Sequence, residues 1–264
     1  MTMGRRISII SGKGGVGKTT VAANLSAALA KLGKKVVVID ADVAMANLAL
    51  FFGLQSAPIT LQDVLRGEAE IYDAMYEGPN GLIIVPSGLS LQEYRRVNPE
   101  KMEEVLRGLE NEFDYVFLDA PAGIEDNTMA AMAAASEAIF VVTPDKASIA
   151  DAIKAKLSAE RIGVKPYGVI INMVRGIPGE PSEDDVKNIM ELAVLGSVPE
   201  DDEVRRTLLL KKPSPVVVRR PDSPAAKAFM EIASRIAGVQ MKQEPKKDFL
   251  TVIKTIFKSV FKKK

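Results

Sequence analysis

The chain has 264 residues, of which 47% are hydrophobic and 26% charged, a size and composition that suit one large globular domain. It lacks cysteine, which excludes disulfides and thiolate-bound metal sites, and histidine, the commonest general base, so chemistry falls to lysine, acids, threonine and amides. The net charge of +1 is unevenly spread: residues 242–264 hold eight lysines and two acids, or +6, so the remainder carries 1 − 6 = −5.

Short apolar runs alternate with helical patterns from the first residues onward. Residues 7–11 form an apolar run that stops at a glycine cluster, and residues 18–32 read as a helix closed by Gly33. Residues 36–39 are a continuous β-branched run ending at Asp40, as expected for a strand covered on both faces. Later strand-like runs are residues 82–85, 115–118, 138–143, 167–171 and 194–198.

Helix-start signals stand between several of these runs. Asn98 with Pro99, Ser182, and Ser223 with Pro224 are typical N-cap sequences. Strands that alternate with helices predict an α/β fold: a doubly wound, mostly parallel sheet with helices on both faces. Ligands in such sheets bind at the carboxyl ends of the strands. We expect one domain over residues 1–237, a polar linker over 238–248 and a separate helix over 249–264.

The strongest motif lies between the first strand and the first helix. It fits G-x-x-x-x-G-K-[ST], a loop whose amides and helix N-terminus bind phosphate groups. We expect Lys18 to reach the β- and γ-phosphates and Thr19 to bind Mg²⁺, which makes ATP and Mg²⁺ the predicted cofactors. A glycine-rich turn without a ligand is the alternative. The predicted nucleotide contacts here are Gly12, Lys13, Gly14, Gly15, Val16, Gly17, Lys18, Thr19 and Thr20.

Carboxylates end two of the predicted strands. Asp119 follows the apolar run 115–118 and is expected to hold Mg²⁺ through water. Asp40 and Asp42 follow the second strand, and without histidine a carboxylate that orients water toward the γ-phosphate is a reasonable chemical choice. All three could instead be simple caps of strand ends or turns.

A further lysine in the glycine loop, Lys13, narrows the choice among classes of phosphate-binding protein. The run 13–20 resembles the deviant Walker A motif of the MinD/ParA family of P-loop ATPases, and the resemblance covers about residues 6–237. It implies that Lys13 crosses the interface of an ATP-bound homodimer and acts with Lys18 in catalysis. A solvated loop lysine is the alternative reading of Lys13.

The resemblance assigns further roles at other positions. It implies that Asp42 positions the attacking water and belongs to the metal site, and that Asp40 matches a family residue nearer the metal. It also implies that Asn172, together with a loop after the next strand, contacts the adenine, although ordinary turn chemistry explains these residues as well. That loop is Pro199, Glu200 and Asp201.

Three stretches look more like the MinD branch than the other branches. They are residues 40–48, 121–125 and 199–201. Relatives whose distinguishing chemistry needs cysteine drop out, because the chain has none. The resemblance implies an ATPase that positions the division site or polar assemblies.

The last 16 residues form a two-sided helical pattern. At 100° per residue, Phe, Leu, Ile and Val occupy one half of the wheel over 249–262, and Lys, Thr and Ser the other half. An amphipathic helix with one apolar and one cationic face, tethered by a linker, suits the surface of an anionic membrane. In type and location it resembles the C-terminal membrane-targeting helix of the MinD branch. The helix could instead pack on its own body or on a partner, while DNA would not use the aligned apolar side chains.

These features predict a membrane-cycling ATPase that acts as a spatial switch. We expect a cytoplasmic protein, peripheral on the inner face of the cell membrane when ATP-bound, and slow hydrolysis until an unidentified activating or cargo protein stimulates it. No run of residues approaches the ~20 apolar positions of a membrane span. A DNA or cargo partition ATPase of the ParA type is the main alternative, and a small-molecule phosphotransferase or ligase is the third.

Overall fold

One eight-stranded sheet organises the computed structural model, which describes residues 3–42, 46–88, 101–124 and 126–239. The strand order is β3-β4-β2-β5-β1-β6-β7-β8, and every neighbouring pair is parallel except β3 with β4. This topology confirms the predicted fold class. The strands are β1 Arg5–Ile10, β2 Val36–Asp40, β3 Tyr76–Glu77, β4 Ile83–Val85, β5 Tyr115–Asp119, β6 Glu137–Val142, β7 Lys165–Val174 and β8 Val194–Pro199.

Two strands differ most from the sequence expectation, whereas the bounds of the others shift by only one or two residues. The edge strand β3 has only two residues, too few for an alternating pattern, and was not predicted. β7 continues three residues beyond the expected end at 171, because it pairs with β8 as far as Val174 and Pro199. Asn172 therefore lies inside β7 and not after it.

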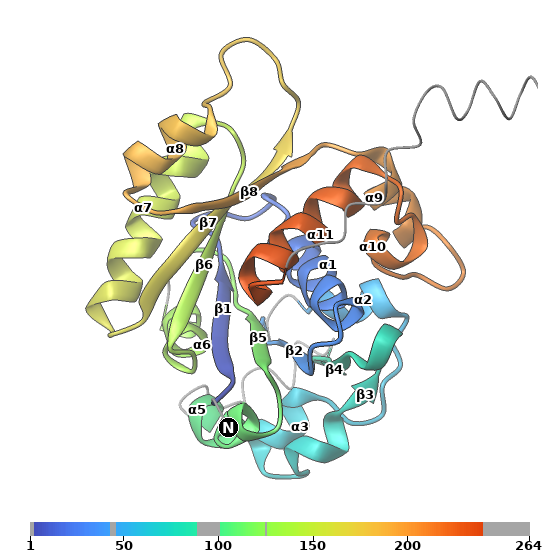
Figure 1. Ribbon diagram of the computed structural model, residues 1–264. Helices are drawn as coiled ribbons and strands as arrows, with labels where there is room; N and C mark the ends of the chain where they lie inside the picture. Colours follow the sequence, from blue (N-terminus) through green and yellow to red (C-terminus); the bar gives the residue numbers. More distant parts are fainter. Residues whose placement is uncertain (1–2, 43–45, 89–100, 125, 240–264) are drawn as a thin grey trace, which may run out of the picture.

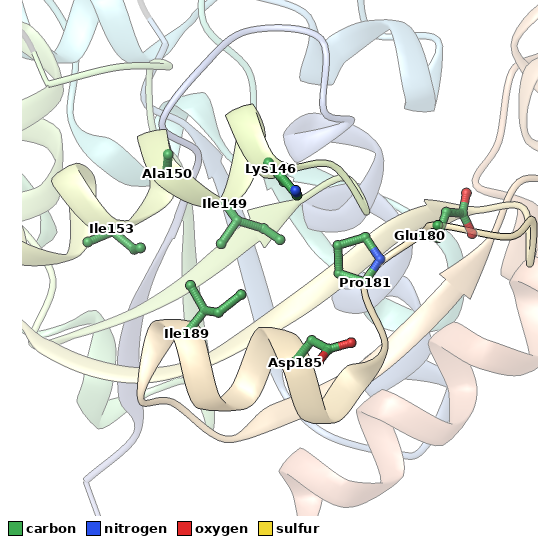
Figure 2. A pocket seen from close by; sticks show the side chains of 9 residues that line it. Lys146, Ile149, Ala150, Ile153, Glu180, Pro181, Asp185 and Ile189 are labelled. Carbon is green, nitrogen blue, oxygen red and sulfur yellow. The ribbon is translucent and has the colours of Figure 1, made fainter.

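Helices cover both faces of this sheet, as Figure 1 shows. Contacts place α1, α10 and α11 over one face, while α7 and α8 cover β6 to β8 on the other. The helices are α1 Lys18–Lys31, α2 Leu48–Phe52, α3 Leu61–Arg66, α5 Met102–Leu106, α6 Asp126–Ala133, α7 Lys146–Arg161, α8 Glu183–Met190, α9 Asp202–Leu208, α10 Val216–Arg219 and α11 Pro224–Ala237. Short 3-10 turns are η1 Ile71–Ala74, η2 Pro79–Gly81 and η4 Leu109–Asn111.

Two of the predicted helix starts are confirmed. The Ser182 side chain accepts from the amide of Asp185 at the start of α8, and Ser223 accepts from the amide of Ala226 at the start of α11. Asn98 and Pro99 lie outside the described residues.

The core is built from strands whose side chains alternate between the two helical layers. In β1, Ile7 and Ile9 pack toward α1 and α11, whereas Ile10 joins the cluster beneath α7 and α8. All three are fully buried. Both faces of the central strands therefore lie under helices, which explains the continuous apolar runs in their sequences.

The last described helix ends where the sequence changes in composition. α11 stops at Ala237, and Gly238 closes it in the left-handed conformation at φ 63°. The greater part of the predicted linker and the whole amphipathic helix fall in residues 240–264, outside the described residues. Within the described ranges, no helix combines the length and apolar character needed to span a bilayer.

Candidate nucleotide-binding site

The glycine loop leaves β1 and enters α1 with its outer side open. Gly15 and Gly17 both have φ +84°, and a side chain on Gly14 or Gly15 would meet no atom within 4 Å. α1 begins at Lys18 with no side-chain cap, so its first amides are free of competing side-chain acceptors. Open amides at the positive end of a 14-residue helix form an anion site.

Lys18 turns inward to the carboxylate that ends β5. Its Nζ lies 2.6 Å from Asp119 Oδ1, and the side chains are only 8% and 1% exposed. The parallel register places Asp119 between Ile9 of β1 and Asp40 of β2. The predicted Lys18 and Asp119 are thus brought into direct contact at the carboxyl ends of the central strands.

Asp40 adds a second buried carboxylate beside this pair. It accepts hydrogen bonds from the amides of Asp42, Asn47 and Leu48 at 3.2, 3.1 and 3.0 Å. Burial raises the pKa of Asp40 well above its ordinary value, and the charge of Asp119 raises it further. The hydrogen bond from the Leu48 amide lowers the pKa, but offsets only part of this increase. Asp40 therefore also serves as a structural acceptor for the chain that follows β2.

At this edge of the sheet two buried carboxylates, Asp119 and Asp40, face a single cation, Lys18, so negative charge is in excess. Asp119 Oδ2 is also buried without a hydrogen-bond partner among the described residues. An oxygen-seeking cation fits such a place, and Thr19, half-buried in the first turn of α1, adds a hydroxyl. Mg²⁺ in nucleotide sites is usually held by one or two protein oxygens together with phosphate and water oxygens, a pattern that Asp119 and Thr19 would fit.

Asp42 stands next to this centre but belongs to its outer side. The residue is half-buried, and its amide is fixed by the Asp40 carboxylate, whereas residues 43–45 are not described. Its roles as water-orienting base and metal ligand stay predictions.

Lys13 behaves differently from Lys18. Its Nζ lies 3.3 Å from Asp145 Oδ1, with side chains that are 36% and 46% exposed. Asp145 caps α7 through the Ser148 amide and accepts from the Thr143 hydroxyl. Partial burial alone would raise the pKa of Asp145, but these hydrogen bonds and Lys13 outweigh it and lower the pKa. Lys13 thus rests at the rim in reach of solvent.

Asn172 holds the loop and leaves little room around it. Its Nδ2 donates to the carbonyl of the buried Val16 at 2.9 Å, and Asn172 itself is 4% exposed. A Cβ on Gly17 would lie 2.3 Å from that nitrogen, and one on Gly12 would lie 2.2 Å from the backbone of Asp151. Asn172 is therefore adjacent to the phosphate loop, and its predicted adenine contact stays a prediction.

The loop after β8 is ordered by polar contacts of its own. The amide of Glu200 donates to Val174, and its carboxylate pairs with Arg175 at the end of β7. Asp201 caps α9 through the Glu203 amide and also accepts from an amide in the first turn of α11. Pro199 is the last residue of β8 and is half-buried. This loop stands beside Asn172 in the sheet, while adenine binding by its three residues stays a prediction.

Two residues of this region were missed from sequence. Asp145 had a usable signal, because it follows a predicted strand and precedes a helix as an N-cap does. Arg175 had none, since its pairing with Glu200 depends on the alignment of β7 with β8.

The fold and the loop together define a P-loop nucleotide hydrolase. Residues 7–214 match the model of the CobQ/CobB/MinD/ParA nucleotide binding domain, and the chain belongs to this family. It is a MinD-type ATPase with ATP and Mg²⁺ as cofactors.

Individual relatives agree with this assignment. An uncharacterised ATP-binding protein of Methanocaldococcus jannaschii is 46% identical over 97% of this chain and 96% of its own length. The septum site-determining protein MinD of Synechocystis sp. is 36% identical over 98% of this chain and 97% of its own. Among solved structures, MinD of Pyrococcus horikoshii complexed with Mg-ADP superposes with a TM-score of 0.85 at 36% identity, covering 91% of this chain and 100% of that one.

Proposed function

We propose that this ATPase is a membrane-cycling spatial switch. ATP and Mg²⁺ draw two copies together across the glycine loop, and the pair presents two copies of segment 249–264 to an anionic membrane surface. A protein partner, an activator or a cargo, then triggers hydrolysis and release. The cycle takes place between the cytoplasm and the inner face of the cell membrane.

The contrast between the two loop lysines supports this proposal best. Lys18 is enclosed and paired with Asp119, so it serves the nucleotide of its own subunit. Lys13 is 36% exposed beside the exposed Gly14 and Gly15, and its partner Asp145 is more exposed still. A weak, solvent-screened ion pair is readily exchanged for a charged phosphate of a facing subunit.

Dimerisation matters because a single amphipathic helix is a marginal anchor. Two linked anchors gain from effective concentration, so their joint residence on lipid greatly exceeds that of one. Nucleotide state is thereby converted into membrane occupancy. Thr19 and Asp119 would hold Mg²⁺, which would neutralise charge on the phosphate oxygens, and Asp42 would orient the attacking water.

Vesicle sedimentation tests the proposal directly. Intact protein is mixed with anionic vesicles and no nucleotide, ADP or ATP, beside a chain ending at Glu244, Lys18→Ala and Lys13→Gln. Only the intact chain with ATP is expected to pellet strongly. Lys35→Gln, an exposed lysine at the far end of β2, is the matched control and should behave like the intact chain. Equal pelleting in every nucleotide state would refute the switch.

A further inference from the structure

The connection between α9 and α10 exposes two leucines beside two lysines. Leu209 is 78% exposed, more than any other large hydrophobic side chain in the described ranges, and Leu210 is 40% exposed. Lys211 and Lys212 are exposed as well. We call residues 209–212 the leucine–lysine loop; in Figure 1 it belongs to the orange connection at the edge of the molecule.

Rigid stems hold this loop outward. α9 ends at Leu208, which packs against the core, and α10 begins at the buried Val216. Val217 is fixed on both sides, since its amide donates to Asn24 Oδ1 at 3.2 Å and its carbonyl accepts from Lys31 of α1 at 3.4 Å. Because the stems complete the packing, the two exposed leucines are not needed to stabilise the body.

The loop lies in a basic island on an acidic body. Residues 202–222 hold six basic and three acidic side chains, a charge of +3, so the rest of the body carries −5 − 3 = −8. Two arginines of the island, Arg206 and Arg220, are tied to Glu203. Lys211 and Lys212 form no ion pair within the described part of the chain. They are therefore available to an external anion.

We propose that the leucine–lysine loop is a second membrane contact, in which the leucines enter the headgroup region of an anionic bilayer and the lysines pair with lipid phosphates. Exposed aliphatic side chains next to lysines suit a lipid surface, where the aliphatic groups reach the acyl chains and the lysines stay at the charged headgroups. Nucleic acid would use the lysines but not the leucines. This inference rests on the membrane cycle proposed above and specifies how the body meets the lipid.

The distances allow loop and tail to meet one surface. α11 starts just after α10, and its 14 residues carry the chain about 21 Å to Gly238. A fully extended chain of 11 residues, the length of the predicted linker, reaches up to about 40 Å, which exceeds the length of α11. Two separate contacts would fix the orientation of the ATPase body, which a single flexible tether cannot do.

A tryptophan reporter tests the contact without relying on total binding. The chain contains no tryptophan, so Leu209→Trp gives a single tryptophan in the full-length protein. With ATP and anionic vesicles we expect its emission to shift to the blue. Leu157→Trp is the matched control, because Leu157 is a 50% exposed leucine on α7, and its emission should not change when vesicles are added.

Paired variants supply the second measurement. Leu209→Ser with Leu210→Ser should lower vesicle partitioning about ten-fold, whereas Leu157→Ser with Ile162→Ser should not. Lys211→Gln with Lys212→Gln should lower it about five-fold for each lysine on anionic vesicles only, the change that about 1 kcal/mol per lysine produces. Unchanged melting temperatures would show that these variants fold.

The outcomes separate the two proposals. If the intact chain binds vesicles with ATP but Leu209→Trp does not shift and the loop variants bind equally, the loop meets something else, such as a protein, and this inference is overturned while the switch stands. If no variant binds vesicles in any nucleotide state, both proposals are overturned.

Discussion

Removing Lys18 should destabilise the protein even without nucleotide, and more so at high pH. Lys18 is the cation facing two buried carboxylates, Asp119 at 2.6 Å and the neighbouring Asp40. Breaking a buried pair from one side costs about 3 kcal/mol or more, because the remaining charge stays unsolvated. For a chain of this size that corresponds to a fall in melting temperature of about 6–12 °C.

The pH dependence follows from the sign of the Asp40 shift. Burial and the charge of Asp119 already raise the pKa of Asp40, while Lys18 lowers it, so Lys18→Met raises it further. A carboxyl group whose pKa is raised by folding destabilises the folded state increasingly as pH rises above its unfolded pKa. The loss in melting temperature should therefore be larger at pH 8 than at pH 5.5.

Thermal unfolding followed by circular dichroism, at both pH values and without nucleotide, measures the effect. Lys18→Met with Asp119→Asn removes both charges and should recover most of the loss. Lys154→Met is the matched control: its pair with Asp151 spans 3.0 Å but leaves Lys154 65% exposed, so it should change little. If Lys18→Met melts at the intact protein's temperature at both pH values, this account of the buried centre is wrong.

Two further changes test the surroundings of the site. Gly17→Ala should abolish binding of a fluorescent ATP analogue, because the new Cβ would lie 2.3 Å from Asn172 Nδ2. Gly163→Ala is the control: Gly163 has a similar φ of +81°, but a Cβ there would meet no atom within 4 Å. This control should lower the stability of the fold, because of its positive φ, and should leave ATP binding intact. Asp201→Ala should lower the melting temperature at pH 7 by a few degrees, the effect of about 1 kcal/mol for a lost helix cap. Burial alone would raise the pKa of Asp201, but the amides of Ala225 and Glu203 outweigh it and lower the pKa, so this stabilisation is present above the unfolded value of 3.8 and fades as pH falls through the lower folded value. A difference between Asp201→Ala and the intact chain that is the same at pH 7 and pH 3 would contradict this reasoning.

Local sequence determined most of the fold, because each element carries its own physical signature. Continuous β-branched runs such as 36–39 need cover on both faces, and the serines at 182 and 223 cap the helices that follow. The phosphate loop was readable for the same reason, since glycines, lysine and threonine act there through contiguous backbone.

Contacts between distant segments were decided only by tertiary structure. The pairings of Lys18 with Asp119 and of Lys13 with Asp145 join residues 101 and 132 positions apart, and they depend on which strands lie next to β1. The exposure of Leu209 was also decided by tertiary structure. From sequence, a leucine that follows a helix is expected in the core, but here Leu208 and Val216 on either side of the loop pack against the core and Leu209 does not. Sequence specified which groups could do the chemistry, whereas the order of strands in the sheet decided which of them meet.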